Sequence, residues 1–195
     1  MSHRLSLSIL SLVLGLAPTT VALAAPVGAG QPEQLHFADD GVIPNSRLPV
    51  LLYRQVPLEG TDRAAALERL FADSAWPPKW RYGVYSYHHY HPNAHEVLGV
   101  ARGQATLRLG GEQGQDVAVA AGDVVVLPAG TGHRNLESSE DFLVVGAYPP
   151  DQQDFITQRA DPEAHGRSLE LIAQVPVPTT DPVTGRAGAL PGLWR

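Results

Sequence analysis

Short runs of apolar residues, separated by Gly, Pro, Asn and Asp, dominate the chain from residue 49 onward. Such runs are typical of β-strands when turn residues bound them. The clearest is Gln104–Leu109, in which Ala105, Leu107 and Leu109 alternate with polar residues, so this strand is predicted to bury one face. The predicted strands are Pro49–Gln55, Tyr82–His91, Glu96–Ala101, Gln104–Leu109, Asp116–Ala120, Asp123–Leu127 and Asp141–Tyr148.

One segment near the N-terminal end of the pattern has helical periodicity instead. Leu67, Leu70 and Phe71 are spaced to form a single apolar stripe on a helix, and Thr61 is the expected N-cap. No helical pattern interrupts the strands between residues 82 and 148, which favours a closed or double-sheet antiparallel architecture. The fold class is therefore predicted to be all-β, with one N-terminal helix and a short helical or irregular C-terminal segment.

The two ends of the chain carry different signals. Residues 1–24 combine a short basic start, an apolar run and the small-x-small sequence Ala22-Leu23-Ala24, which together predict a cleaved signal peptide. The protein is then expected to be exported, to a bacterial periplasm, with an uncleaved N-terminal anchor as the alternative. At the other end, Leu193-Trp194 is predicted to lie back on the barrel, because an exposed Trp would leave a large apolar surface in water.

Between these ends the chain is predicted to form a Gly/Pro-rich flexible linker over residues 25–35 and one domain over residues 36–195, with a core at about 82–148. A length of 195 residues with 44% hydrophobic and 17% charged residues is usual for such a globular protein. The chain has no cysteine, which excludes disulfides, thiolate ligands and a cysteine nucleophile. A net charge of −6 without a basic cluster argues against nucleic acids and anionic membrane surfaces as partners, and no stable membrane span is expected.

Candidate chemistry gathers in residues 83–103, GVYSYHHYHPNAHEVLGVARG, which hold four of the eight histidines. Successive side chains of a strand point to opposite faces, so His89 and His91 are predicted to lie on one side, about 7 Å apart, with His88 on the other. Read alone, each of these histidines is more often an ordinary strand residue than a ligand. Their combination with two later residues changes that interpretation.

Glu96 and His133 complete the candidate set. The turn expected at Pro92–Ala94 would bring Glu96 back over the pocket, and His133 follows a Pro-x-Gly-x-Gly turn that could place it on a neighbouring strand. Three imidazoles and one carboxylate suit Mn, Fe, Ni or Zn, and suit Ca, Mg or Cu(I) less well. His95, directly before Glu96, is the less favoured alternative ligand.

The two spacings resemble the two sequence motifs of the cupin superfamily. They are Gly83-x5-His89-x-His91-x4-Glu96-x6-Gly103 and Gly122-x5-Pro128-x-Gly130-x2-His133. Over about residues 36–195 the chain is similar to single-domain bacterial cupins of the YjlB type. The resemblance implies a double-stranded β-helix (jelly-roll barrel) and a divalent metal ion held by His89, His91, Glu96 and His133; it implies no substrate.

Three function classes follow from such a site. A divalent ion with one bound carboxylate leaves a net charge of about +1, which favours a small anionic ligand. Tyr85 and Tyr87 are predicted to share the inward face with the histidines, where they either hold a substrate or simply fill the barrel mouth. The favoured class is an enzyme that acts on a small organic acid or polyol, as a dioxygenase or oxidase or as a lyase or isomerase. The alternatives are a metal-centred binding or sensing protein and a purely structural metal site. The sequence is compatible with a homodimer and does not determine the oligomeric state.

Overall fold

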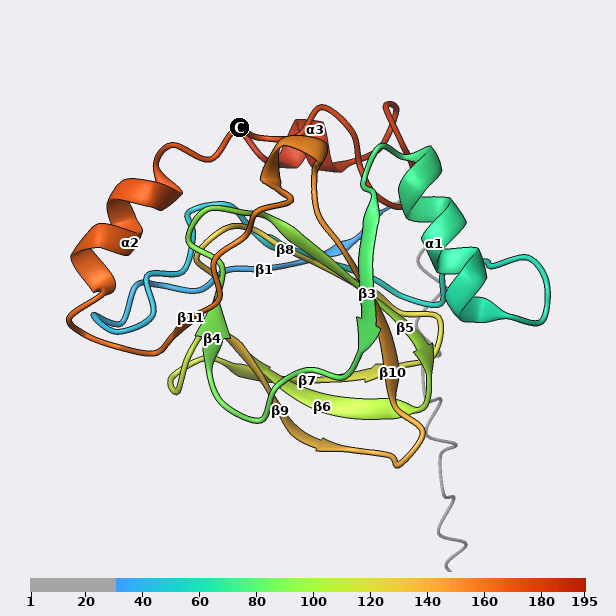
Figure 1. Ribbon diagram of the computed structural model, residues 1–195, viewed down its shortest axis with the longest axis horizontal. Coiled ribbons are helices and arrows are strands. Elements are labelled where there is room, and N and C mark those ends of the chain that lie inside the picture. Colours follow the sequence, from blue (N-terminus) through green and yellow to red (C-terminus); the bar gives the residue numbers. More distant parts are fainter. Residues whose placement is uncertain (1–30) are drawn as a thin grey trace, which may run out of the picture.

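Two antiparallel sheets enclose a barrel in the computed structural model, which describes residues 31–195 (Figure 1). Its strands are β1 Glu33–Leu35, β2 Val50–Tyr53, β3 Pro78–Tyr82, β4 His89–Tyr90, β5 Glu96–Arg102, β6 Gln104–Leu109, β7 Gln115–Ala120, β8 Val124–Leu127, β9 His133–Ser138, β10 Leu143–Ala147 and β11 Gln158–Arg159. One sheet has the order β1-β2-β8-β5-β10-β3 and the other β11-β4-β9-β6-β7. The predicted all-β jelly-roll architecture is confirmed. The signal peptide predicted for residues 1–24 lies outside the described residues.

The four central strands of the six-stranded sheet, β2, β8, β5 and β10, are buried on both faces, which explains their apolar runs. In β2, Val50 and Leu52 belong to the core inside the barrel, whereas Leu51 and Tyr53 belong to a second core on the outer face of the same sheet. A strand that is covered on both sides has no solvent face, so its sequence does not alternate. The five-stranded sheet differs: in β6 the inward residues are buried and alternate with partly exposed ones, as predicted.

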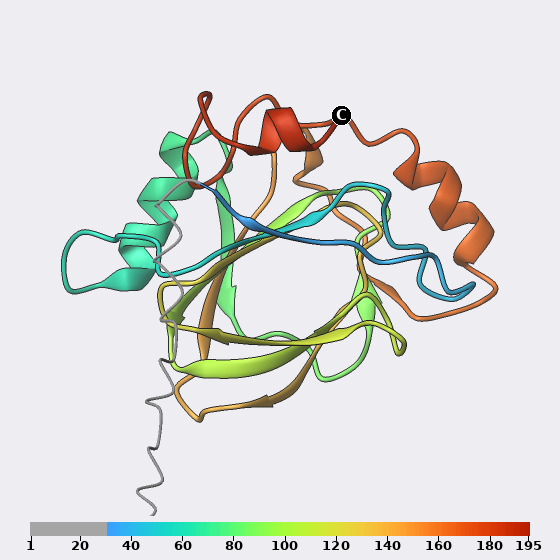
Figure 2. The same cartoon turned by 180° about the vertical axis from the view of Figure 1, so that it is seen from behind.

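Helix α1, Arg63–Asp73, covers the outer face of the six-stranded sheet beside β3 and β5 (Figures 1 and 2). Its stripe residues Leu67 and Phe71 are fully buried against the sheet. A Cβ at Gly99 of β5 would lie 2.8 Å from the side chains of both residues. Glycine at this position therefore lets the helix approach the strand closely.

The N-cap of α1 is Asp62, and the prediction of Thr61 was wrong. The Asp62 carboxylate accepts a hydrogen bond from the backbone N–H of Ala65, at 3.1 Å, because α1 begins one residue later than the sequence suggested. Asp62→Ala is expected to lower the folding equilibrium constant roughly fivefold, as the loss of an N-cap usually does. Thr61→Ala, the matched control, should change it little. Urea denaturation of both variants measures this, and equal losses would contradict the assignment.

Three strand predictions need correction. Residues 82–91 were expected to form one strand, but 83–88 are irregular and only His89–Tyr90 form β4. Glu33–Leu35, predicted as part of the linker, form β1 by pairing with β2. Strand β9 was not predicted, because HRNLES carries no apolar alternation and is held in place by pairing with β6. Each missed strand depends on a distant partner.

The C-terminal segment packs back on the barrel, as predicted. It contains the short helix η1 Pro150–Gln152, α2 His165–Ile172 and α3 Leu190–Leu193. Trp194 is 2% exposed, and its indole N–H donates to the carbonyl of Pro49 at 2.8 Å. Within residues 31–195, none of the helices has the length and apolar character needed to cross a bilayer.

Candidate metal centre

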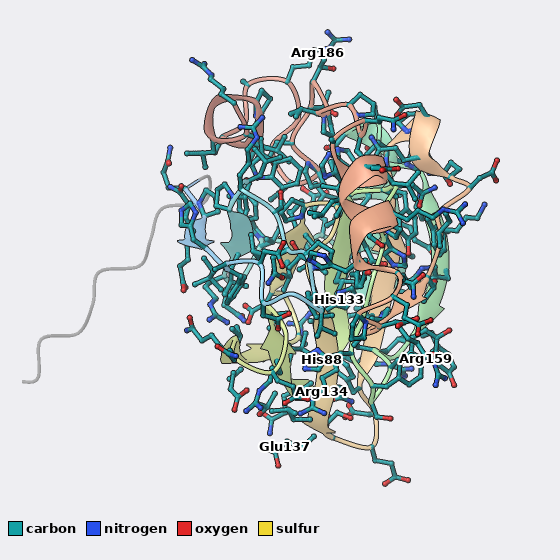
Figure 3. All side chains as sticks on the ribbon, turned by 90° about the vertical axis from the view of Figure 1, so that its left-hand side faces the viewer. His88, His133, Arg134, Glu137, Arg159 and Arg186 are labelled. Atoms are coloured by element: carbon teal, nitrogen blue, oxygen red, sulfur yellow. The ribbon has the colours of Figure 1, made fainter. Side chains whose placement is uncertain are left out.

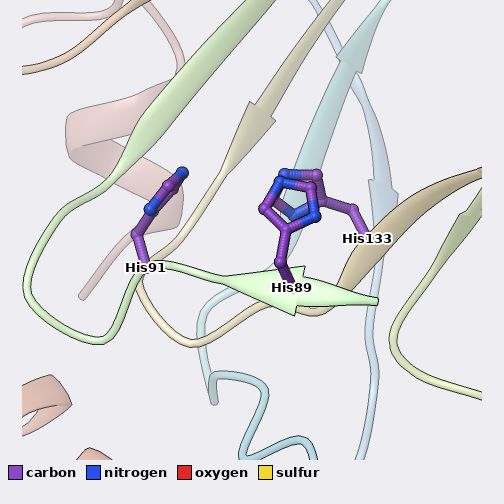
Figure 4. Close-up of side chains that lie close together, drawn as sticks. All are labelled: His89, His91 and His133. Atoms are coloured by element: carbon purple, nitrogen blue, oxygen red, sulfur yellow. The ribbon is translucent and has the colours of Figure 1, made fainter. Parts of the chain in front are cut away.

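Pairing of β4 with β9 brings two of the candidate histidines face to face. His89 is the direct cross-strand partner of His133, and their ring centroids are 4.1 Å apart. His91 lies just beyond β4 and turns its ring toward the other two (Figure 4). One ring nitrogen from each residue lies within 4.8 Å of the other two, and all three side chains are buried.

A backbone carbonyl orients each of the three imidazoles. The Nδ1–H groups of His89, His91 and His133 donate to carbonyl oxygens of Tyr87 at 3.2 Å, Ile156 at 2.7 Å and Thr131 at 3.0 Å. A carbonyl oxygen only accepts, so Nδ1 carries a proton in each ring, and Nε2 has the lone pair whenever the ring is neutral. This tautomer leaves Nε2 free to bind a metal ion.

The loop that orients His91 is itself held by Asn93. The Asn93 amide donates to the carbonyl of Asp154 at 3.0 Å and accepts from the N–H of Ile156 at 2.7 Å. Asn93 was predicted only as a turn residue. Its second role depends on residues more than sixty positions away, which the local sequence does not reveal.

Glu96, the first residue of β5, points at the same spot. Its Oε1 lies 3.3 Å from His91 Nε2, and its Oε2 lies 3.3 Å from His133 Nε2. Oε2 is buried and has no hydrogen-bond partner within the described part of the chain. Carboxylate and imidazole lone pairs at this distance repel each other unless a proton or a cation lies between them. The residues present therefore fit a bound cation.

The spacings also suit a first-row metal. Two atoms that bind one ion at right angles, each about 2.1 Å away, are about 3 Å apart. The carboxylate oxygens lie at 3.3 Å from their imidazole neighbours. His89, His91, His133 and Glu96 could thus hold one divalent ion between them.

The charges of the site are strongly coupled. Burial opposes a charged His91, but the Glu96 carboxylate outweighs this effect and raises the pKa of His91. Burial likewise opposes a charged Glu96, but His91 and His133 hold its pKa well below the usual range. Burial, and next the neighbouring His133, lower the pKa of His89 to about 3. Both shifts favour a protonated His91 beside an ionised Glu96 when no metal is bound.

Tyr148 is a site residue that the sequence did not reveal. Its hydroxyl donates to Glu96 Oε1 and accepts from the indole N–H of Trp80 at 3.0 Å. Burial, and next the charge of Glu96, raise the pKa of Tyr148, so the phenol stays protonated. Trp80 reaches this position because its cross-strand partner is Gly146, where a Cβ would collide with the indole. The hydrogen bond from Tyr148 thus engages Oε1 of Glu96, and Oε2 of Glu96 remains available to bind a metal ion.

The histidines and Glu96 line a cavity of about 450 Å³. Trp80, Leu98 and Phe155 supply much of its apolar wall, and Tyr85 and Thr157 add hydroxyl groups. Arg81 also borders the cavity, but its guanidinium binds Glu68 at 2.6 and 2.7 Å. The cavity can therefore take a small molecule with an apolar body.

Only one of the two predicted tyrosines lines this cavity. Tyr85 does. The Tyr87 ring instead stacks on that of Tyr85, with centroids 4.9 Å apart, and the guanidinium carbon of Arg159 lies 3.9 Å from the Tyr87 ring centroid. Strand alternation does not apply here, because residues 83–88 are irregular. Both rings lie near that of His89, with centroids 5.1 and 5.8 Å away, but only Tyr85 borders the metal cavity.

The two spare histidines lie away from the triad. His95 Nδ1 accepts from the N–H of Ala129 at 2.9 Å, and its ring lies 4.7 Å from that of Trp194, so it holds the barrel and the C-terminal tail together. His88 faces a separate hollow beside Glu112.

Comparisons with known proteins agree with this description. Residues 80–145 match the family model of the Cupin domain. The uncharacterized protein YjlB of Bacillus subtilis is 40% identical over 159 residues, which cover 81% of this chain and 93% of that protein.

Two solved structures show weaker similarity. An uncharacterized Klebsiella pneumoniae protein with a double-stranded β-helix domain is 12% identical, with 75% of this chain and 98% of that one covered and a TM-score of 0.35. Procruciferin, an 11S globulin from Brassica napus, is 21% identical with a TM-score of 0.34; the match covers 40% of this chain and 21% of that longer protein.

Proposed function

This chain belongs to the YjlB-like cupins, and from that premise we propose that it is a divalent-metal-binding enzyme that acts on a small organic acid or polyol. Its metal ligands would be His89, His91, Glu96 and His133. The observation that carries the proposal is the cluster of three buried histidine ring nitrogens beside Glu96, which lies 3.3 Å from two of them and whose buried Oε2 has no hydrogen-bond partner in residues 31–195.

The cavity supports an anionic substrate with a small apolar body. Three neutral imidazoles and one carboxylate around a divalent ion leave a net charge of about +1. Among the cavity-lining residues the only other cation is Arg81, which Glu68 already neutralises. A substrate carboxylate would therefore find its counter-charge at the ligand cluster, while its carbon atoms pack against Trp80, Leu98 and Phe155.

The reaction would be that of a dioxygenase or oxidase, or of a lyase or isomerase. A bound metal ion supplies Lewis acidity and, if it is Fe, Mn, Ni or Cu, redox chemistry. The chain's own part is to hold Glu96 in place through Tyr148, to keep the imidazoles in one tautomer and to surround the substrate with apolar walls that exclude water.

Elemental analysis of the protein purified from its native compartment tests the proposal. About one equivalent of Mn, Fe or Ni per chain would support the redox classes, and Zn would favour a lyase or isomerase. Protein without any stoichiometric transition metal would overturn the metal-dependent function.

A metal-centred binding protein without turnover is the second candidate. The observation that favours it is that Tyr148, the buried phenol beside the ligands, is committed to Glu96 and so is a poor proton donor. Incubation of the metal-loaded protein with a panel of small carboxylates separates the two candidates, because a binding protein would return them unchanged.

Tyr148→Phe is expected to weaken metal affinity by roughly tenfold, at the lower end of what loss of a partner behind a metal ligand costs. The phenyl ring keeps its stacking on Phe155, with centroids 4.0 Å apart, so the packing should survive. Without the hydroxyl, Glu96 can rotate away from the binding position. Competition with a metal-sensitive dye measures the affinity, and an unchanged value would contradict the role given to Tyr148.

Export is part of the proposal as well. Its support is the apolar N-terminal run and the site at Ala22-Leu23-Ala24. The mature protein is expected to begin at or near Ala25. N-terminal sequencing of the protein from its native host checks this, and an intact Met1 would refute cleavage.

A further inference from the structure

A second hollow, of about 570 Å³, lies on the far side of β4 from the histidine triad. His88 precedes the candidate ligand His89, and Arg134 follows the candidate ligand His133 in β9. His88 and Arg134 border this hollow together, whereas their neighbours His89 and His133 line the metal cavity. Figure 3 shows the two close to each other at the same end of the barrel, with Arg159 nearby and Arg186 at the opposite end.

The polar groups of this hollow are incompletely satisfied. The His88 side chain is only 5% exposed, and neither of its ring nitrogens has a hydrogen-bond partner within residues 31–195. The Nε–H of Arg134 is buried and unpartnered in the same way. Buried donors without partners are costly, and native proteins usually pair them. These two side chains therefore offer hydrogen-bonding groups to a polar ligand that enters the hollow.

One carboxylate already occupies part of the position. Glu112 is 64% exposed, yet it lies 3.5 Å from His88 Nε2, 3.2 Å from Arg134 Nη2 and 3.4 Å from Arg108 Nη1. It belongs to the turn between β6 and β7, which contains three glycines. The cluster thus binds a carboxylate of its own chain on a solvent-exposed side chain that an external anion could displace.

The other walls indicate what the rest of a ligand would contact. Val42, Ile43 and Tyr87 line the hollow with apolar surface. Arg159 lies over the Tyr87 ring and forms no ion pair with any residue in 31–195, so its positive charge is available. Asp40 also borders the hollow, but its Oδ1 already accepts from the N–H groups of Val42 and Ile43 at 2.9 and 2.6 Å.

We propose that this hollow is a second binding site, for a small carboxylate with an aromatic or apolar body. The ligand carboxylate replaces that of Glu112 between His88 and Arg134, and Arg159 adds a second positive charge. The apolar body lies against Val42, Ile43 and Tyr87. The site shares β4 and β9 with the histidine triad but requires no metal.

Titration of the zinc-exchanged protein with benzoate, followed by ¹H–¹⁵N NMR, tests the site. Benzoate should shift the Nε–H signal of Arg134 and the amide signal of Gly111 with one saturable curve. Signals of the metal cavity, such as the Gly83 amide, report separately on any binding there. No saturable shift at Arg134 and Gly111 would overturn the proposal and leave the hollow as a water-filled pocket.

Three variants make the test specific. Arg134→Gln should weaken benzoate binding at this site by roughly tenfold or more, because it removes a charge-assisted contact. Glu112→Gln should strengthen binding, because it removes the competing carboxylate. Arg186→Gln, an arginine distant from the hollow, should leave the affinity unchanged. Weaker binding by Glu112→Gln, or equal losses in Arg134→Gln and Arg186→Gln, would show that the carboxylate does not bind between His88 and Arg134.

Discussion

Alanine at His89, His91, Glu96 or His133 is expected to weaken metal affinity by more than about 100-fold, since loss of a partner behind a ligand already costs 10–100-fold. The three ring nitrogens lie within 4.8 Å of one another, and Glu96 lies 3.3 Å from the Nε2 atoms of His91 and His133. Removing any one of them takes away a bond and the preferred geometry. Metal content after dialysis, with affinity measured by dye competition, gives the result.

His88→Ala and His95→Ala are the matched controls, since both residues are buried histidines next to a candidate ligand. Metal affinity per folded chain should stay nearly unchanged in both. His95→Ala leaves the N–H of Ala129 without its acceptor, so this variant should be less stable and its occupancy has to be compared with the folded fraction. If His95→Ala emptied the site and Glu96→Ala did not, both the ligand set and the anion argument would be wrong.

Glu96→Gln distinguishes the charge of Glu96 from its shape. The amide is nearly the same size and can still accept from Tyr148, but it carries no charge to balance a cation. Affinity should fall well below that of the wild type while thermal stability changes less than in Glu96→Ala. Equal affinities of wild type and Glu96→Gln would mean that the three imidazoles suffice.

The strands around the site could be predicted wherever the sequence is apolar for a local reason. Residues 124–127 and 50–53 are apolar throughout because the barrel covers one face and α1 or the C-terminal tail covers the other. Residues 104–109 alternate because one face meets solvent. These patterns follow from burial of neighbouring residues, so they are visible in the sequence itself.

The residues that orient the metal ligands could not be predicted, because each forms its hydrogen bonds with residues far away in the sequence. Tyr148 holds Glu96 from 52 residues away, and Asn93 holds a loop 61 to 63 residues further on. The alternation argument placed Tyr87 in the cavity wrongly, since it assumed a continuous strand where residues 83–88 are irregular. In both cases tertiary contacts decide the geometry and leave no local periodicity.

Metal binding is expected to depend on pH through the proton on His91. In the metal-free protein Glu96 raises the pKa of His91, so His91 is protonated up to a pH above its usual range. A metal must displace that proton to reach the Nε2 lone pair. The proton on His91 should therefore lower the affinity about tenfold for each pH unit below the pKa of His91, and this contribution should level off above that pKa.

His89 should not steepen this dependence, because burial and His133 lower its pKa to about 3 and the ring is neutral at every practical pH. Three independent imidazoles of ordinary pKa would instead give a slope approaching three decades per pH unit below about pH 6. Dye competition between pH 5 and 8 distinguishes the two cases.

Glu96→Gln removes the charge that raises the pKa of His91. The pH at which the affinity levels off should therefore move lower in this variant, even though the plateau affinity is weaker. A midpoint that stayed in place would show that the Glu96 carboxylate does not control the proton on His91.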